Sequence, residues 1–343
     1  MPHVPSRPLL ALALAFLPAS PALAGGEDEL EAAIRGLTAA AEAPLRPLFP
    51  LAREEPSPAA VAYFRHYGLS FPAATHHFGV VEAGEHRLAA HVFVPARPRG
   101  TVVVLHGYYD HAGILSRLIG FLVGTGFAVA AFDLPGHGLS TGERATIGDF
   151  AQYVDALAVF AAACRRHLPG PYHFVGHSTG AAVALDHVLS AGEGAFDEVV
   201  LLAPLVRSYG WKLSRVGGAI ARPFTDEVPR VFRKNSGDEE FLDFVAADPL
   251  QYRGVPLSWA AALERWNERI ESLPPSDEEL LVIQGTDDTT IDWEHNLDVI
   301  RRLLPRARIE VLDGARHHLA NESAAIRERV FALIRERLER DQG

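Results

Sequence analysis

Short runs of apolar residues recur along most of the chain, and stretches with apolar positions at helical spacing separate them. The runs are rich in valine, leucine, isoleucine, phenylalanine and alanine, as is typical of strands buried on both faces of a sheet. They are residues 88–94, 101–106, 128–133, 172–177, 198–203, 280–284 and 309–312. Because consecutive parallel strands need crossover connections, this alternation predicts an α/β fold with a mostly parallel central sheet and helices on both faces.

The spacing of these strands breaks once. Nearly eighty residues separate the strand that ends near Ala203 from the strand that starts near Leu280. An insertion of this length after a late strand predicts a cap over one edge of the sheet. We therefore expect the core to comprise residues 76–204 and 276–343, with a cap or lid at residues 205–275.

The N-terminal part of the chain does not follow this pattern. Residues 1–24 combine an arginine, an apolar run over residues 9–17 and the small-residue site Ala22-Leu23-Ala24, and so predict a secretory signal peptide. The apolar run is too short to span a bilayer. We expect an exported protein, periplasmic or secreted, after cleavage near Ala24; an uncleaved anchoring helix is the alternative. Residues 25–75 are expected to form an N-terminal helical extension, of which residues 25 to about 60 are alanine-, glutamate- and proline-rich and predicted to be loosely attached.

The pentapeptide Gly-His-Ser-Thr-Gly at residues 176–180 lies between a predicted strand and a run of small, helix-favouring residues. A turn this sharp brings the strand and the helix so close that both flanking positions must be glycine. The Ser178 hydroxyl then projects from the carboxyl edge of the sheet, and the Thr179 amide lies at a helix N-terminus that favours a developing oxyanion. The pentapeptide predicts a nucleophilic serine, although an ordinary strand-helix turn can carry the same pattern.

A serine hydroxyl needs a histidine to take its proton and a carboxylate to orient that histidine. Three carboxylates follow the strand at 280–284, and two histidines follow the last strand. They are Asp287, Asp288 and Asp292, and His317 and His318. The order serine, acid, histidine is the order of a triad on an α/β-hydrolase sheet, but strand positions alone leave the choice within each group open.

The loop after the strand at 101–106 is the expected source of a second oxyanion-binding amide, that of Tyr108. This loop also contains His106 and His111 in a His-x-x-x-Asp-His pattern that resembles metallo-hydrolase loops. Tyr108 stands where such loops require a further histidine, so we interpret both histidines as braces of the loop and expect no metal site.

Composition narrows the class of protein. The chain has 343 residues, of which 48% are hydrophobic, enough for a sizeable core. Its net charge of −11 argues against a nucleic-acid partner. The sequence has no Walker loop, dinucleotide fingerprint or paired CxxC motif, so we expect no cofactor.

Five segments together resemble one branch of the α/β-hydrolases over about residues 75 to 335, that of the monoacylglycerol lipases and lysophospholipases, also called serine aminopeptidase-like. These segments are His106-Gly107-Tyr108, the run at 132–140, the pentapeptide at 176–180, Gly285-Thr286-Asp287-Asp288 and Gly314-Ala315-Arg316-His317. The resemblance implies that Asp288 is the acid, because the family's acid is the fourth residue of Gly-x-x-Asp. It likewise implies that His317, which follows Gly-Ala-x, is the base.

The resemblance also implies a reaction and a substrate class. We expect a serine ester hydrolase that acts through an acyl-enzyme on a small-molecule ester or lipid, most closely a monoacylglycerol or a lysophospholipid. A general carboxylesterase, an aminopeptidase of the same fold and a catalytically silent lipid-binding module are the alternatives.

The first part of the cap, residues 205–235, is basic although the chain is acidic. Its basic residues are Arg207, Lys212, Arg215, Arg222, Arg230, Arg233 and Lys234. Apolar residues such as Trp211, Leu213 and Phe224 lie between them. Such a mixture predicts peripheral contact with an anionic membrane through the cap, with a solvated helix face as the alternative.

Overall fold

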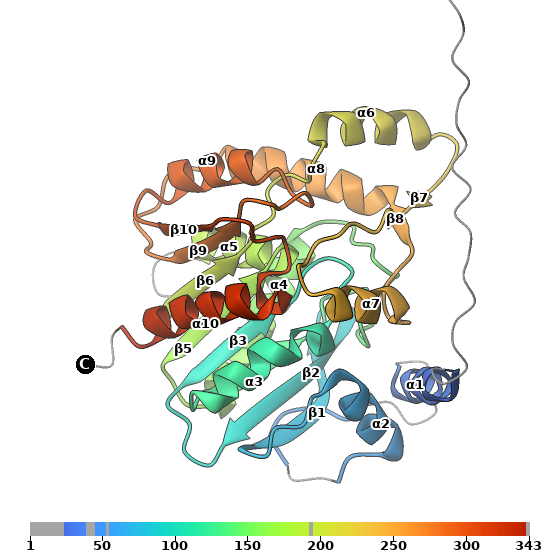
Figure 1. Cartoon of the computed structure of the whole chain (residues 1–343), viewed down its shortest axis with the longest axis vertical. Coiled ribbons are helices and arrows are strands. Elements are labelled where there is room, and N and C mark those ends of the chain that lie inside the picture. The colour runs from blue at the N-terminus through green and yellow to red at the C-terminus, as the bar shows by residue number, and fades with distance from the viewer. Residues whose placement is uncertain (1–23, 39–44, 53–54, 192–194, 341–343) are drawn as a thin grey trace, which may run out of the picture.

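The computed structural model describes residues 24–38, 45–52, 55–191 and 195–340. Within these ranges, eight strands form one sheet in the order β1-β2-β4-β3-β5-β6-β9-β10 (Figure 1). Their bounds are β1 Ala74–Ala83, β2 His86–Pro95, β3 Thr101–Leu105, β4 Ala128–Phe132, β5 Tyr172–His177, β6 Glu198–Leu202, β9 Leu281–Gly285 and β10 Arg308–Leu312. β2 pairs antiparallel with both β1 and β4, and the remaining pairs are parallel. The predicted fold class, an α/β-hydrolase fold with a mostly parallel sheet, is confirmed.

The middle of the sheet is buried on both faces, as its uninterrupted apolar runs require. Every residue of β3, β4 and β6 is buried. The register aligns Leu105 of β3 with Gly176 of β5, and Gly176 with Leu201 of β6. The carboxyl ends of these strands therefore meet at one edge of the sheet, where the predicted site residues follow.

Helices cover both faces of the sheet. In Figure 1, α3 and α10 lie in front of it, and α4 and α5 lie behind it. The bounds of the core helices are α3 Ser116–Gly124, α4 Ala151–His167, α5 Thr179–Ala191, α9 Trp293–Leu303 and α10 Ala324–Leu338. Two 3₁₀ turns, η1 Ala112–Leu115 and η2 Leu319–Asn321, complete the core.

The predicted insertion between β6 and β9 contains a separate group of elements. They are α6 Trp211–Ala221, β7 Glu227–Pro229, α7 Glu239–Ala247, β8 Gly254–Pro256 and α8 Leu257–Glu271. β7 and β8 pair antiparallel as a two-stranded sheet of their own. We call residues 205–275 the cap; Figure 1 shows α6 as its outermost helix.

Two helices precede the sheet, α1 Ala24–Leu37 and α2 Pro58–Tyr67. α2 begins with a Ser57 cap, whose hydroxyl accepts from the Ala60 amide at 3.2 Å, and ends at Gly68 in the left-handed conformation. Tyr63 and Tyr67 on this helix are fully buried in the main core. α2 is therefore an integral part of the core. Leu30 and Leu37 of α1 belong to the same core, so the expectation of loose attachment for residues 25 to about 60 is wrong.

The predicted signal peptide lies, apart from its last residue Ala24, outside the described residues. Export stays a prediction that the N-terminal residue of the mature protein would test. Among the helices that the structure describes, none is both long enough and apolar enough to traverse a membrane.

Candidate active site

Ser178 lies in the turn between β5 and α5. Its backbone adopts the left-handed conformation, with φ of 51°, and its amide donates to the Leu202 carbonyl at 2.9 Å. A Cβ on Gly176 would lie 2.8 Å from the Gly180 carbonyl carbon, and a Cβ on Gly180 would lie 2.5 Å from the Leu105 carbonyl oxygen. Both flanking glycines are thus required for the turn to pass between the strands, as the pentapeptide predicts.

Ser178, His317 and Asp288 form a continuous hydrogen-bonded chain. The Ser178 hydroxyl lies 3.0 Å from His317 Nε2, and His317 Nδ1 lies 2.7 Å from Asp288 Oδ2. A carboxylate only accepts, so Nδ1 carries the proton and Nε2 is left to accept from the serine. All three side chains are buried, with exposures of 3 to 6%. The arrangement provides a base in contact with a nucleophile, and an acid that fixes the base.

The Asp288 carboxylate is held by several donors. Oδ1 accepts from the amides of Thr290 and Ile291 at 2.8 and 3.2 Å, and Oδ2 accepts from Gln284 Nε2 at 3.1 Å. Burial alone would raise the pKa of Asp288, but the His317 imidazole and these hydrogen bonds hold it below its ordinary value. Asp288 is therefore a carboxylate at neutral pH.

The structure also distinguishes Asp288 and His317 from the neighbouring acids and histidine that strand order left as alternatives. The side chain of Asp287 is exposed, and Asp292 precedes α9. His318 faces Asp110, with His318 Nε2 3.8 Å from Asp110 Oδ2. The residues that the resemblance implied are the ones that form the hydrogen-bonded chain: His317 contacts Ser178, and Asp288 contacts His317.

The predicted oxyanion residues, Tyr108 and Thr179, belong to two segments that meet at Ser178. Thr179 is the first residue of α5, and the loop with Tyr108 passes close to the serine, since a Cβ on Gly107 would lie 3.1 Å from Ser178 Cβ. Among the described residues, neither the Tyr108 amide nor the Thr179 amide donates to a backbone carbonyl outside the helices and strands. Both amides are therefore free to bind a negatively charged oxygen.

The two loop histidines do act as braces. His106 donates from Nδ1 to the Gly107 carbonyl at 2.8 Å and accepts at Nε2 from the Leu134 amide at 2.9 Å. Burial lowers the pKa of His106 to about 3, so it stays neutral. His111 lies 2.9 Å from Asp248 of the cap and ties the loop to it.

The sequence did not point to several contacts that join the cap to the site. Asp186 on α5 is buried and accepts from Trp266 Nε1 at 2.8 Å and from Arg269, both on α8. Trp259, also on α8, stacks on the Tyr108 ring with 3.6 Å between ring centroids. A single carboxylate among the apolar residues of α5 was the only local indication of such a link. Gln284, a polar residue in an apolar strand, likewise indicated its role beside Asp288.

A family profile, sequence relatives and a solved structure all relate this chain to the same group of hydrolases. The profile of the serine aminopeptidase, S33 family matches residues 96–324. Human monoglyceride lipase is 27% identical over 252 residues, which cover 69% of this chain and 81% of the lipase. The monoacylglycerol lipase of Mycolicibacterium smegmatis is 28% identical over 250 residues, 69% of this chain and 88% of that protein. A soluble variant of Saccharomyces cerevisiae monoglyceride lipase shares the fold, with a TM-score of 0.66 at 16% identity over 78% of this chain and 96% of that one.

The family match covers more than half of the chain and spans the whole site. Tyr108, Ser178, Asp288 and His317 all lie within residues 96–324. The chain therefore belongs to the serine aminopeptidase, S33 family, in the branch of the α/β-hydrolases that contains the monoacylglycerol lipases.

Proposed function

We propose that this serine ester hydrolase cleaves a monoacylglycerol or a lysophospholipid through an acyl-enzyme on Ser178. The observation that carries the proposal is the buried chain from the Ser178 hydroxyl to His317 Nε2 and from His317 Nδ1 to Asp288. The names of the sequence relatives, human and mycobacterial monoacylglycerol lipases, support a lipid ester as the substrate.

In the proposed reaction, Ser178 Oγ attacks the ester carbonyl carbon while its proton moves to His317 Nε2. The carbonyl oxygen becomes an oxyanion, which the Tyr108 and Thr179 amides stabilise by about 3 kcal/mol each. When the intermediate collapses, His317 returns the proton to the leaving alcohol. Water then attacks the acyl-enzyme with His317 again as base, and Ser178 is released with the fatty acid.

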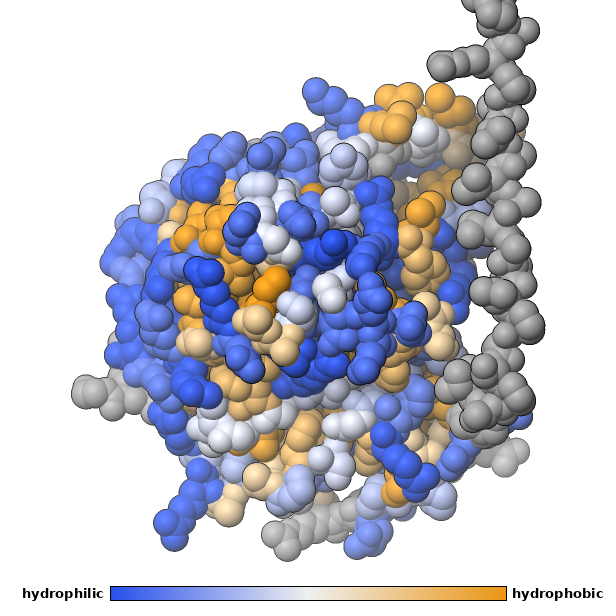
Figure 2. Space-filling view, in the orientation of Figure 1, coloured by the Kyte–Doolittle hydropathy of each residue, from blue (hydrophilic) through white to orange (hydrophobic). Residues whose placement is uncertain are grey.

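The outer face of the cap carries exposed apolar residues, which support the proposal that the enzyme takes its substrate from a lipid surface. Leu213, Val216, Ile220 and Phe224 follow helical spacing along α6 and just beyond it, and we call them the apolar cap patch. Their side chains are 80, 59, 66 and 86% exposed. Figure 2 shows apolar residues gathered at the position of α6. An apolar face of this kind suits insertion into a membrane interface or a micelle.

The basic residues of the cap support membrane contact less than their number suggests, because some of them form ion pairs within the cap. Arg222 lies 3.3 Å from Glu264, and Arg215 lies 3.4 Å from Glu268, both on α8. Within the part of the chain that the structure describes, Lys212, by contrast, forms no ion pair. Because Arg215 and Arg222 are already paired with glutamates, less positive charge is available to a membrane than the sequence suggests. We therefore assign the membrane contact chiefly to the apolar cap patch.

Replacing Leu213 and Phe224 together with serine is expected to weaken binding to phosphatidylcholine vesicles by about 100-fold or more, since each buried apolar side chain contributes about 1.5 to 3 kcal/mol. Vesicle co-sedimentation measures this change. Val159→Ser, at an exposed apolar position on α4, is the matched control and should bind as the wild type does. Equal binding by the double variant and the wild type would contradict the membrane role of the patch.

A fluorophosphonate probe is expected to label the wild-type protein on Ser178, because the adjacent imidazole activates that hydroxyl. Mass spectrometry of the labelled peptide locates the adduct. A catalytically silent lipid-binding module would not react, so an unlabelled, folded protein would count against the enzyme itself.

A substrate panel then separates the remaining alternatives. Monoacylglycerols, lysophospholipids, short p-nitrophenyl esters and aminoacyl arylamides are compared by kcat/KM. We expect the two lipid classes to rank above the others. A preference for short esters would indicate a general carboxylesterase, and a preference for arylamides would indicate an aminopeptidase.

A further inference from the structure

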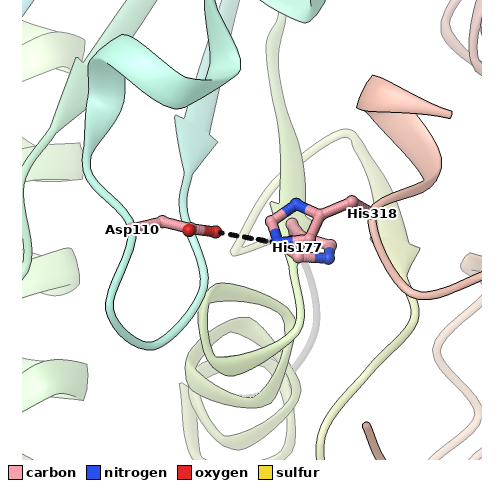
Figure 3. Close-up of side chains that lie close together, drawn as sticks. All are labelled: Asp110, His177 and His318. Atoms are coloured by element: carbon pink, nitrogen blue, oxygen red, sulfur yellow. Dashed lines mark ion pairs between the residues drawn. The ribbon is translucent and has the colours of Figure 1, made fainter. Parts of the chain in front are cut away.

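Three metal-ligating side chains meet directly beside the triad, outside its hydrogen-bonded chain. Asp110 comes from the loop after β3, His177 ends β5, and His318 follows the triad histidine (Figure 3). Asp110 Oδ2 lies 3.7 Å from His177 Nδ1 and 3.8 Å from His318 Nε2. One ligand atom from each residue lies within 4.8 Å of the other two, and all three residues are buried.

One hydrogen bond orients the His177 ring. His177 Nε2 lies 3.1 Å from the His317 carbonyl oxygen, which can only accept, so Nε2 carries a proton. His177 Nδ1 then faces the Asp110 carboxylate. A separation of 3.7 Å exceeds hydrogen-bond length. Among the described residues, both Asp110 Oδ2 and His177 Nδ1 lack a hydrogen-bond partner.

The environment of Asp110 also favours a ligand role, because the residue is only 2% exposed. A buried carboxylate with an unpaired oxygen is costly unless a cation or a donor compensates it.

Nearby groups compensate the Asp110 carboxylate only in part. Gln251 Nε2 reaches the other Asp110 oxygen only at 3.4 Å. Arg230 lies near the cluster, but it donates to Gln251 Oε1 at 2.8 Å and stacks over the Tyr109 ring at 3.8 Å. Asp110 Oδ2 and His177 Nδ1 therefore face each other at 3.7 Å, and neither has a hydrogen-bond partner among the described residues.

We propose that Asp110, His177 and His318 bind a divalent zinc ion through Oδ2, Nδ1 and Nε2. Zinc takes imidazole nitrogen and carboxylate oxygen at about 2.0 to 2.2 Å, which sets tetrahedral ligand atoms about 3.4 Å apart. The separations of 3.7 and 3.8 Å from Asp110 need only small side-chain movements to reach this value, and the two imidazole nitrogens, which lie within 4.8 Å of each other, must also approach. The bond from His177 Nε2 to a backbone carbonyl is the contact that metal-ligating histidines usually make with their other nitrogen.

The site has a predictable effect on the triad. His318 is bonded directly to His317, and His177 contacts the His317 carbonyl. A dication bound by one carboxylate and two neutral rings leaves net positive charge near the His317 imidazole. That charge opposes protonation of His317 during acyl transfer, so bound zinc is expected to lower kcat.

Isothermal titration of the purified protein with zinc chloride at pH 7, after treatment with EDTA, tests the site. The wild type is expected to bind one equivalent. Asp110→Asn and His318→Leu are each expected to weaken the affinity by about 100-fold or more, since even indirect contacts to metal ligands change affinity by about 10- to 100-fold. Magnesium chloride should give no binding, because magnesium prefers all-oxygen sites.

Two controls locate the ion. His187→Ala, at a histidine of α5 outside the cluster, should bind zinc as the wild type does. His317→Ala should also keep its affinity, which distinguishes the cluster from the triad as the binding site. If His317→Ala abolished binding while His318→Leu preserved it, the assignment would be overturned.

Thermal unfolding checks that the variants fold, and zinc should raise the Tm of the wild type but not of His318→Leu. If Asp110→Asn fails to fold, His318→Leu decides the question. No binding by the wild type would also overturn the proposal. The contact between Asp110 and His177 would then be an ordinary ion pair. These binding measurements need no esterase activity, so their failure is distinguishable from failure of the proposed function.

Discussion

Replacing Ser178 with alanine is expected to reduce kcat for ester hydrolysis by about 10⁴-fold or more, because the nucleophile is lost. Among the residues that the structure describes, the Ser178 side chain forms a hydrogen bond with His317 Nε2 alone. Removing one hydroxyl at this turn leaves the glycines and the strand register in place. The measurement is steady-state hydrolysis of a monoacylglycerol and of a soluble ester.

Ser258→Ala is the matched control, since Ser258 is an exposed serine on α8. It should retain wild-type kcat and KM. Circular dichroism and thermal unfolding establish that Ser178→Ala is folded. Wild-type turnover by a folded Ser178→Ala protein would refute the hydrolase mechanism as a whole.

Asp288→Asn is expected to lower kcat by about 10³- to 10⁴-fold, because the amide no longer favours the His317 tautomer that leaves Nε2 free to accept. The change alters no volume, and the Thr290 and Ile291 amides can still donate to the side-chain oxygen. Steady-state kinetics at pH 7 compare it with Asp287→Asn, the matched neighbour with an exposed side chain. Asp287→Asn should have near-wild-type activity. If Asp287→Asn were the damaging change, Asp287 would replace Asp288 as the acid.

The parallel part of the sheet was predictable because each strand is marked by its own apolar run. The segment predicted at residues 172–177 coincides with β5, and the segment at 198–203 differs from β6 by one residue. β1 was missed, since it is an antiparallel edge strand whose first half is only partly buried. Its two histidines and partial exposure leave no continuous apolar run, so only pairing with β2 defines it.

The three triad positions were predictable for a different reason. Parallel strands bring their carboxyl ends to one edge, so residues that follow β5, β9 and β10 had to meet there. The choice of Asp288 over Asp287 depended on the resemblance, because the two differ by one position on a turn. The structure now gives a geometric reason, since Asp288 is buried against His317 and Asp287 is exposed.

Contacts between segments far apart in the sequence could not be predicted. The basic stretch of the cap seemed free because its partners, Glu264 and Glu268, belong to a helix some forty to fifty residues later. The cluster of Asp110, His177 and His318 likewise draws its residues from three separate segments of the chain. Local composition indicates the residue types, whereas the pairing depends on how the cap and the core pack together.

The attachment of α8 divides the cap into two parts with separate roles. Trp266 and Arg269 fasten α8 to Asp186, on the helix that starts beside the nucleophile, and Trp259 stacks on the oxyanion-loop tyrosine. α6, by contrast, carries the exposed patch and contacts α8 through Arg215 and Arg222. Substitutions on the exposed face of α6 are therefore expected to change how the protein engages a surface while leaving the hydrogen-bonded chain of Ser178, His317 and Asp288 unchanged.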